Sequence, residues 1–490
     1  MGTKSKLDGL DEHFEASLKH FNVPGAAVSV VKDGEVVLAK GYGYKDFTNK
    51  APMTENTVLP IGSATKSFTA MAACILADEG KLCLDAPVRK YLPGFEMHDP
   101  AATQYITLRD MLCHRGGMPR HDLMWAVTTS TSFTREDLVA RIRYLEPNAG
   151  FREKSQYQNH MIAAVGHVVE KVSGTTWEDF VKEKILSPLG MDSSNFSCAD
   201  SQKMADFGLP HKWDKQKNII VTDFMELGPS GPAGSINSTA SDMAKWMLLV
   251  LSNGSIGEIV SEEKMKEMLT PHMHYSELPW EFEEIAFSSL GLGWFMDVYR
   301  GTKIVHHGGN VLGATAMCAL LPKENLGITI LANLGSTFVT YAIRNEVFDR
   351  ALGVTGGNWD VRYKDEFDKL YAKMEEGKAK ASESRKEGTK PTHDPAAYEG
   401  RYENPGYGAV IVKKGADGGF ELDFNGKKLA MEHYHYNQFS IELADFETEL
   451  PAVFGVSVKG DIDTLTIPFE METGKQTVFT KKADKTPSEA

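Results

Sequence analysis

The chain has 490 residues, which is more than one compact core accommodates and indicates two or three domains. Its hydrophobic fraction of 42% and charged fraction of 24% are ordinary for a globular protein. The formal net charge of −14 argues against a broad nucleic-acid-binding surface, which would need clustered Lys and Arg, so we expect no nucleic-acid partner.

The first elements predicted along the chain are a helix and a strand pair. Apolar residues recur at helical spacing in the first of them, at Leu10, Phe14, Leu18 and Phe21. Residues 26–32 and 35–39 are typical of strands, and Asp33-Gly34 between them is a strong hairpin signal. Residues 67–79 then show helical spacing of apolar side chains before a glycine.

The middle of the chain is predicted to be mainly helical. Helices are expected over residues 108–112, 158–172, 177–186 and 241–251. Strands return over residues 313–321 and 327–333, and a helix is expected over residues 340–351. Strands at both ends with helices between them indicate a mixed α/β body with a helical insertion.

The composition changes near the C-terminus. Residues 376–393 carry no large apolar side chain and are typical of an exposed linker. Beyond them, Phe420, Leu422 and Phe424 alternate as in a strand, and turn signals lie on either side. About ninety residues of short strands and turns favour a small barrel or a sandwich.

The cysteines and the lack of a long apolar run indicate where in the cell the protein is located. The five cysteines are scattered, odd in number and free of a C-x-x-C pair, which is typical of reduced thiols. The first residues show no secretory signal, and no run of about eighteen apolar residues occurs. We therefore expect a cytoplasmic protein without a membrane span.

Ser63-Ala-Thr-Lys66 is the first motif with catalytic chemistry. A serine at the start of a helix and a lysine three residues later share one face, so the amine reaches the hydroxyl. Serine needs such a base to become a nucleophile, and lysine serves once burial or a nearby charge lowers its pKa. The alternative is that Ser63 caps the helix. Ser261-Glu-Glu-Lys264 has the same spacing, but its acidic residues favour a simple N-cap.

Two later motifs favour the catalytic interpretation. Tyr157-Gln-Asn159 places a phenol and an amide just before a helix, and a lysine ammonium beside the phenol can lower its pKa and make it a base. His307-Gly308-Gly309-Asn310 precedes another strand. Its glycines allow close approach of the backbone, and the Asn310 N–H can donate to an oxyanion. Taken singly, these motifs also fit a loop tyrosine and a turn.

Together the motifs resemble the serine β-lactamase and penicillin-binding-protein family, in its class C and esterase or D-aminopeptidase-like branch. That family has Ser-x-x-Lys, Tyr-x-Asn and Lys-Thr-Gly or His-x-Gly in this order. The resemblance implies an α/β (α+β) body, with an antiparallel sheet flanked by helices and an all-helical subdomain. The C-terminal segment is similar to a lipocalin-like barrel. The expected domains are residues 8–352 (catalytic), 353–393 (helix and charged linker) and 394–487 (barrel).

The resemblance also implies roles for the motif residues. Ser63 would be acylated, Lys66 and Tyr157 would move protons, and Asn159 would orient the substrate amide or Lys66. The N–H groups of Ser63 and Asn310 would form the oxyanion hole. The histidine at 307, where β-lactamases carry lysine, weakens the expectation of β-lactamase activity.

The leading hypothesis is a cofactor-free serine hydrolase that cleaves a small ester, amide or short peptide. Acyl transfer and a non-catalytic scaffold on the same fold remain alternatives, and the oligomeric state stays open, homo-oligomers included. His433 and His435 would share a strand face, but two ligands are too few for a closed metal site, so no metal is predicted. His114, His121 and Asp122 are expected to make structural hydrogen bonds near a helix end, and lining the mouth of the cleft is the alternative.

Overall fold

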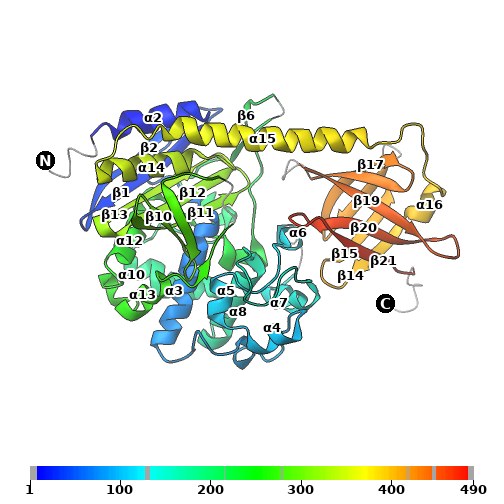
Figure 1. Ribbon diagram of the computed structural model, residues 1–490, viewed down its shortest axis with the longest axis horizontal. Coiled ribbons are helices and arrows are strands. Elements are labelled where there is room, and N and C mark those ends of the chain that lie inside the picture. Colours follow the sequence, from blue (N-terminus) through cyan, green and yellow to red (C-terminus); the bar gives the residue numbers. More distant parts are fainter. Residues whose placement is uncertain are drawn as a thin grey trace.

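The computed structural model describes residues 8–126, 133–214, 216–276, 280–415, 419–443 and 448–483. A nine-stranded antiparallel sheet forms the centre of the body (Figure 1). Its strands, in spatial order, are β3 (Ala51–Pro52), β2 (Glu35–Asp46), β1 (Gly25–Lys32), β13 (Leu326–Ala332), β12 (Ala314–Leu321), β11 (Thr302–Val311), β10 (Phe295–Tyr299), β9 (Ile285–Leu290) and β8 (Met273–His274). The predicted hairpin at Asp33-Gly34 joins β1 to β2, and β1 pairs with β13 from the other end of the body.

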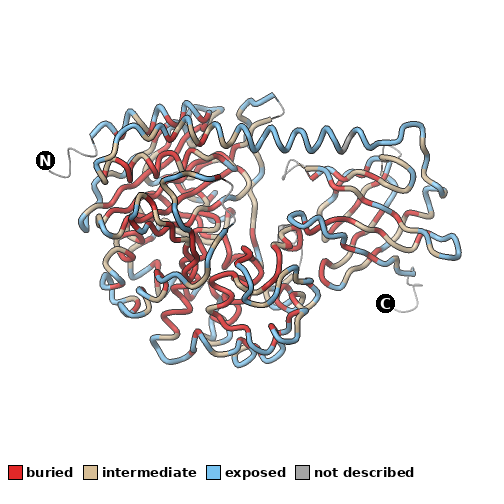
Figure 2. Tube along the Cα trace, in the orientation of Figure 1, coloured by how far each residue is buried: buried red, intermediate tan, exposed pale blue. Residues whose placement is uncertain are grey.

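Helices cover both faces of this sheet. On one face α2 (Leu10–His20) packs against α14 (Val339–Leu352), and their buried side chains form one apolar cluster with the sheet. On the other face α12 (Ala240–Leu251) lies against β1 and β13. The interior of the body is therefore buried from both sides (Figure 2).

An all-helical part is inserted between the two halves of the sheet. Its centre is α3 (Thr65–Asp78), which is buried along nearly its whole length and packs against α8 (Asn159–Ser173). The surrounding helices are α4 (Pro100–Tyr105), α5 (Leu108–Leu112), α6 (Asp122–Ala126), α7 (Arg135–Arg141), α9 (Trp177–Val181), α10 (Ser187–Leu189), α11 (Cys198–Ser201) and α13 (Glu262–Met268). Two short strand pairs lie outside the large sheet, β4 (Leu59–Pro60) with β7 (Asn237–Ser238) and β5 (His211–Trp213) with β6 (Ile219–Val221). The predicted body, an antiparallel sheet with flanking helices and a helical subdomain, is confirmed.

The C-terminal strands close into a separate barrel, which decides between the barrel and the sandwich that the strand pattern left open. Its strands, in order around the barrel, are β14 (Gly400–Asn404), β15 (Gly408–Lys414), β16 (Phe420–Phe424), β17 (Lys427–His435), β18 (Gln438–Leu443), β19 (Thr448–Val456), β20 (Ile462–Glu470) and β21 (Lys475–Lys481). The short helix α16 (Pro395–Tyr398) precedes them, and the alternating residues Phe420, Leu422 and Phe424 point inward.

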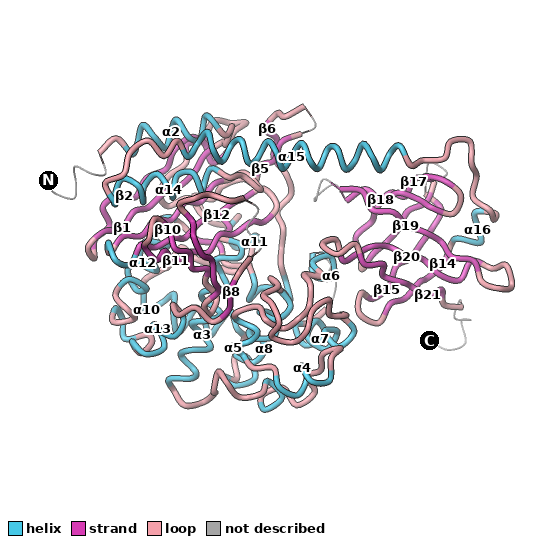
Figure 3. Tube along the Cα trace, viewed as in Figure 1, coloured by secondary structure: helices cyan, strands magenta, loops and turns pink. Residues whose placement is uncertain are grey.

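A long helix, α15 (Trp359–Glu383), runs from the body to the barrel (Figure 1). Its first turns are anchored by the buried Trp359 and Tyr363, whereas the later turns are mostly exposed (Figure 2). The polar stretch predicted as a linker is thus helical up to Glu383 and becomes a loop after it (Figure 3). Among the described helices, none combines the length and the apolar character that crossing a membrane requires.

The barrel also contacts the helical part directly. The Nε2 of His121 donates to the carbonyl of Glu146 at 3.2 Å, so its Nδ1 accepts from the Tyr407 hydroxyl at 2.7 Å. Lys475, at the start of β21, forms an ion pair with Glu146. His121 therefore makes the structural hydrogen bonds expected of it, and one of them joins the two parts of the molecule.

Candidate active site

Ser63 lies in a single 3₁₀ turn, Gly62–Ala64, directly before α3. Its Oγ accepts a hydrogen bond from the Nζ of Lys66 at 2.9 Å, and no side chain caps the N-terminus of α3. The simple capping role is therefore not the one Ser63 has. Ser261, by contrast, is an N-cap: its side chain accepts from the Lys264 N–H at the start of α13.

Lys66 is fully buried on the first turn of α3. Its Nζ donates to the Ala233 carbonyl at 2.7 Å as well as to Ser63. Burial lowers the pKa of Lys66 well below its ordinary value, and the positive charge of Arg120 lowers it further, against the opposing charge of Asp122. A lowered pKa favours the neutral amine, the form that can accept a proton from a serine hydroxyl.

Tyr157 lies beside the same two groups, with the Lys66 Nζ 4.8 Å from its ring centre. Burial raises the pKa of Tyr157, and the Ser63 hydroxyl and the charge of Arg120 only partly oppose this. The expectation of a lowered phenol pKa was wrong, because desolvation outweighs the nearby positive charge. Burial therefore acts on the two groups in opposite directions, lowering the pKa of Lys66 and raising that of Tyr157.

Asn159 is the first residue of α8 and is held by a carboxylate. Its Nδ2 donates to Asp122 Oδ1 at 2.9 Å, which fixes the amide orientation because a carboxylate only accepts. The side chain of Gln158 accepts from the His160 N–H and donates to the Pro119 carbonyl, at 2.8 Å and 2.6 Å. The start of α8 is thereby tied to the loop that carries Asp122.

The third motif lies on β11, against the Ser63 turn. The pairing of β10 with β11 ends at Phe295 and His306, so β10 does not cover the edge of β11 beyond that pair. A Cβ on Gly309 would lie 1.9 Å from the Ile61 carbonyl oxygen, and a Cβ on Gly62 would lie 3.0 Å from the Asn310 nitrogen. Only glycine at 309 permits this approach, which sets the Asn310 nitrogen beside the Ser63 turn.

His307 and Gly308 complete this motif. His307 is buried, and its Nδ1 donates to the Gly308 carbonyl at 2.6 Å, which leaves Nε2 as an acceptor. Burial, with the charge of Lys66, lowers the pKa of His307 to about 3. His307 is therefore neutral near pH 7. A Cβ on Gly308 would meet atoms no closer than 3.5 Å, so this glycine is not needed for close approach.

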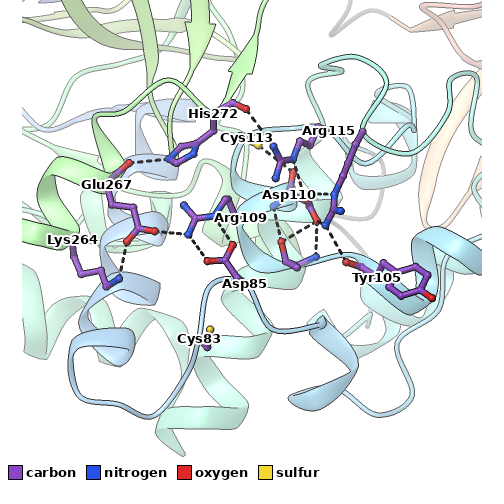
Figure 4. A network of polar contacts seen from close by, with 12 residues as sticks. Cys83, Asp85, Tyr105, Arg109, Asp110, Cys113, Arg115, Lys264, Glu267 and His272 are labelled. Atoms are coloured by element: carbon purple, nitrogen blue, oxygen red, sulfur yellow. Dashed lines mark hydrogen bonds and ion pairs between the residues drawn. The ribbon is translucent and has the colours of Figure 1, made fainter.

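Tyr157 is positioned by a second loop and a buried carboxylate. His114 packs on the Tyr157 ring with centroids 4.6 Å apart, and its Nδ1 accepts from the Gln158 N–H at 3.1 Å. Asp110, fully buried in the capping box of α5, accepts from Arg115 (Figure 4). It also accepts from Arg152 and so joins the two loops. This network holds the segment before His114 and the segment before Tyr157 together.

Arg120 is the residue of this site that the motifs did not predict. Its guanidinium carbon lies 4.8 Å from the Tyr157 ring centre, and its Nε donates to Asp122 Oδ2 at 2.5 Å. The available signal was a Pro-Arg-x-Asp run just after Gly116-Gly117. Asp122, for which structural hydrogen bonds were the favoured role, also accepts from Asn159.

The histidines of the barrel do not join this site. His433 Nε2 donates to the Tyr436 carbonyl at 3.0 Å, and His435 Nδ1 accepts from the Lys386 N–H at 3.3 Å. Over the described residues, no group of three or more His, Cys, Asp or Glu side chains is arranged to hold a metal ion.

Comparison with family models gives two matches. The model described as Beta-lactamase matches residues 10–348, and one described as a domain of unknown function, DUF3471, matches residues 384–481. The first match covers well over half of the chain. It includes all three motifs and the sheet that carries the third.

Similar proteins are found among curated sequences and solved structures. Protein flp of Staphylococcus aureus (strain N315) is 26% identical over 369 residues, which are 74% of this chain and 71% of that protein. Unguisins hydrolase ungD' of Aspergillus campestris is 27% identical over 440 residues, 84% of this chain and 79% of that protein. The octameric penicillin-binding protein homologue of Pyrococcus abyssi superposes with a TM-score of 0.62 at 26% identity and covers 96% of this chain and 99% of its own.

Proposed function

The chain belongs to the Beta-lactamase family, and from this premise we propose a serine hydrolase that cleaves a small ester, amide or short peptide through an acyl-enzyme on Ser63. The observation that carries the proposal is the hydrogen bond from the Lys66 Nζ to the Ser63 Oγ at 2.9 Å. It joins a nucleophile to a base whose pKa is lowered. The name of the Aspergillus relative, a hydrolase, supports the same reaction class.

In the proposed acylation, Ser63 Oγ bonds to the substrate carbonyl carbon while its proton passes to the neutral amine of Lys66. The backbone N–H groups of Ser63 and Asn310 stabilise the oxyanion that forms. When the bond to the leaving group breaks, that group takes a proton from the Tyr157 hydroxyl, which its raised pKa keeps protonated. Lys66 then returns a proton to Tyr157.

In the proposed deacylation, water bonds to the acyl carbon and gives a proton to Lys66. The ester bond to Ser63 Oγ then breaks, and Ser63 takes a proton back from the same pair of residues. The amide of Asn159 faces Asp122 with its nitrogen, so its oxygen is the atom left to accept an N–H of the substrate. Gly308 and Gly309 are proposed to line the substrate beside His307, whose neutral ring offers Nε2 as an acceptor. An alcohol or amine in place of water would make the reaction an acyl transfer, which product analysis distinguishes.

Location, assembly and domain boundaries are part of the proposal. The five cysteines are all unpaired, which suits a reducing compartment, and we propose a cytoplasmic location. The octameric state of the Pyrococcus homologue supports a homo-oligomer, which light scattering after gel filtration tests. We propose residues 8–352 as the catalytic domain, 353–393 as helix and linker, and 394–487 as a lipocalin-like barrel.

A fluorophosphonate probe tests the acyl-enzyme proposal. Intact mass should show one adduct on the native chain, and peptide mapping should locate it on Ser63. Ser63→Ala should abolish the adduct and ester turnover. Ser261→Ala is the matched control, since it removes the same hydroxyl from the same spacing motif, and it should change neither. An adduct that persists in Ser63→Ala would refute the proposal.

A further inference from the structure

Arg120 brings a permanent positive charge to the Ser63 site. Its guanidinium lies over the ring of Tyr157, and the Lys66 Nζ lies at the same distance from that ring. Its side chain is 38% exposed, whereas Lys66 is completely buried. A ligand arriving from solvent can therefore reach Arg120 beside the reacting groups.

Only one of the three nitrogens of this guanidinium is committed within the described part of the chain. Its Nε donates to Asp122, and Arg120 makes no other hydrogen bond there. Burial opposes its charge, but the carboxylates of Asp122 and of Glu472, in the turn between β20 and β21, outweigh this and raise the pKa of Arg120. Both Nη groups remain available as a pair of parallel donors, the arrangement that binds a carboxylate with two hydrogen bonds.

The other basic groups of the site do not offer a lasting positive charge. His307 stands where β-lactamases carry lysine, and burial lowers its pKa to about 3. The pKa of Lys66 is also held well below its ordinary value. The pKa of the buried His114 is lowered in the same way, so Arg120 is the group that stays charged across the working pH range.

We propose that Arg120 is the specificity-determining residue of the site and that it binds a carboxylate of the substrate through its two Nη groups. The proposal rests on the proposed acyl-enzyme function and names its substrate class: esters or amides that bear a carboxylate near the scissile bond. Asp122 couples this anion site to the reaction, because one oxygen holds Arg120 and the other holds Asn159.

Two matched substrate pairs test this proposal. The first compares 4-nitrophenyl hydrogen adipate with 4-nitrophenyl hexanoate, and the second compares 3-carboxyphenyl acetate with phenyl acetate. The native enzyme should prefer the carboxylate member of at least one pair by about 10-fold to 100-fold in kcat/KM. Arg120→Gln should remove this preference, mainly by raising KM, and Arg120→Lys should restore part of it.

Arg401→Gln is the charge-matched control, because it removes an exposed arginine on β14 of the barrel and should retain the preference. The preference should persist from about pH 6 to about pH 10, since a guanidinium stays protonated there. An equal loss of kcat/KM on both members of both pairs in Arg120→Gln would overturn the proposal, as would a native enzyme without any preference.

Labelling of Ser63 by the uncharged fluorophosphonate distinguishes a failure of this proposal from a failure of the proposed hydrolase function on which it rests. An enzyme that is labelled and turns over esters without preferring carboxylates refutes the role of Arg120 alone. A chain that is neither labelled nor active on any of the four esters refutes the hydrolase itself.

Discussion

At the scale of single residues, burial moves the pKa values of Lys66 and Tyr157 in opposite directions. A buried amine loses stability as a cation and a buried phenol loses stability as an anion, so the pKa of the lysine falls and that of the tyrosine rises. Both shifts favour the neutral form, and the neutral form of an amine accepts a proton whereas that of a phenol gives one. The proposed acylation relies on this difference.

This assignment predicts the pH dependence of ester hydrolysis. As the pH falls through the lowered pKa of Lys66, the amine takes up a proton and kcat/KM should fall; above that pKa the rate should level off. Arg120→Gln removes a positive charge that lowers this pKa, so the acid limb should move to higher pH. The full pH profile of a neutral ester measures the shift. An unmoved limb in a folded variant would show that Lys66 is not the titrating base.

At the same scale, the sequence predicts the contact of Ser63 with Lys66 but not the approach of Arg120 to Tyr157. Ser63 lies in the 3₁₀ turn and Lys66 in the first turn of α3 that follows it, so the three-residue spacing alone brings them into contact. Arg120 reaches Tyr157 only because separate loops are brought together around Asp110 and Gln158. The sign of the Tyr157 shift was also beyond prediction, since it depends on the depth of burial.

At the scale of elements, the approach of β11 to the Ser63 turn depends on Gly309. A Cβ there would lie 1.9 Å from backbone at Ile61, and neither backbone can retreat without moving the Asn310 N–H. Gly309→Ala should therefore slow labelling of Ser63 by at least ~10² and lower Tm. Gly308→Ala is the matched control, because its Cβ meets nothing closer than 3.5 Å, and it should lose much less of both. Similar losses in the two variants would contradict this account.

The elements that the sequence predicts are those that bury apolar side chains. The helices of the body, the hairpin at Asp33-Gly34 and strands β12 and β13 belong to this group. The second half of α15 buries little, and its helix is supported instead by local ion pairs such as Lys378–Glu375. A polar stretch of this kind has the composition of a linker, so its helical state was not predicted.

At the scale of the whole molecule, the barrel is joined to the body at two places, through α15 and through the contact of Tyr407 with His121. Trypsin should cut within residues 384–393, after Arg385 or Lys386, which are exposed and outside helices. The two fragments should still elute together on gel filtration and retain labelling of Ser63, because the second contact survives the cut. Tyr407→Phe should make them separate more readily. Fragments that part at once would show that α15 alone joins them.

The double attachment also constrains how the gene for this protein can change in length. Each residue added to a helix moves the chain beyond it by about 1.5 Å along the axis and turns it by about 100°. The loop after α15 is itself tied to the barrel, since Arg385 donates to the carbonyls of His433 and Tyr434. A single-codon insertion in the exposed half of α15 would thus turn Tyr407 away from His121. An insertion of seven codons is close to two full turns, so it would nearly restore the direction in which the barrel faces, although not its position along the helix axis. This polar stretch therefore acts as a helical spacer, in which the number of residues is constrained more than the identity of each residue.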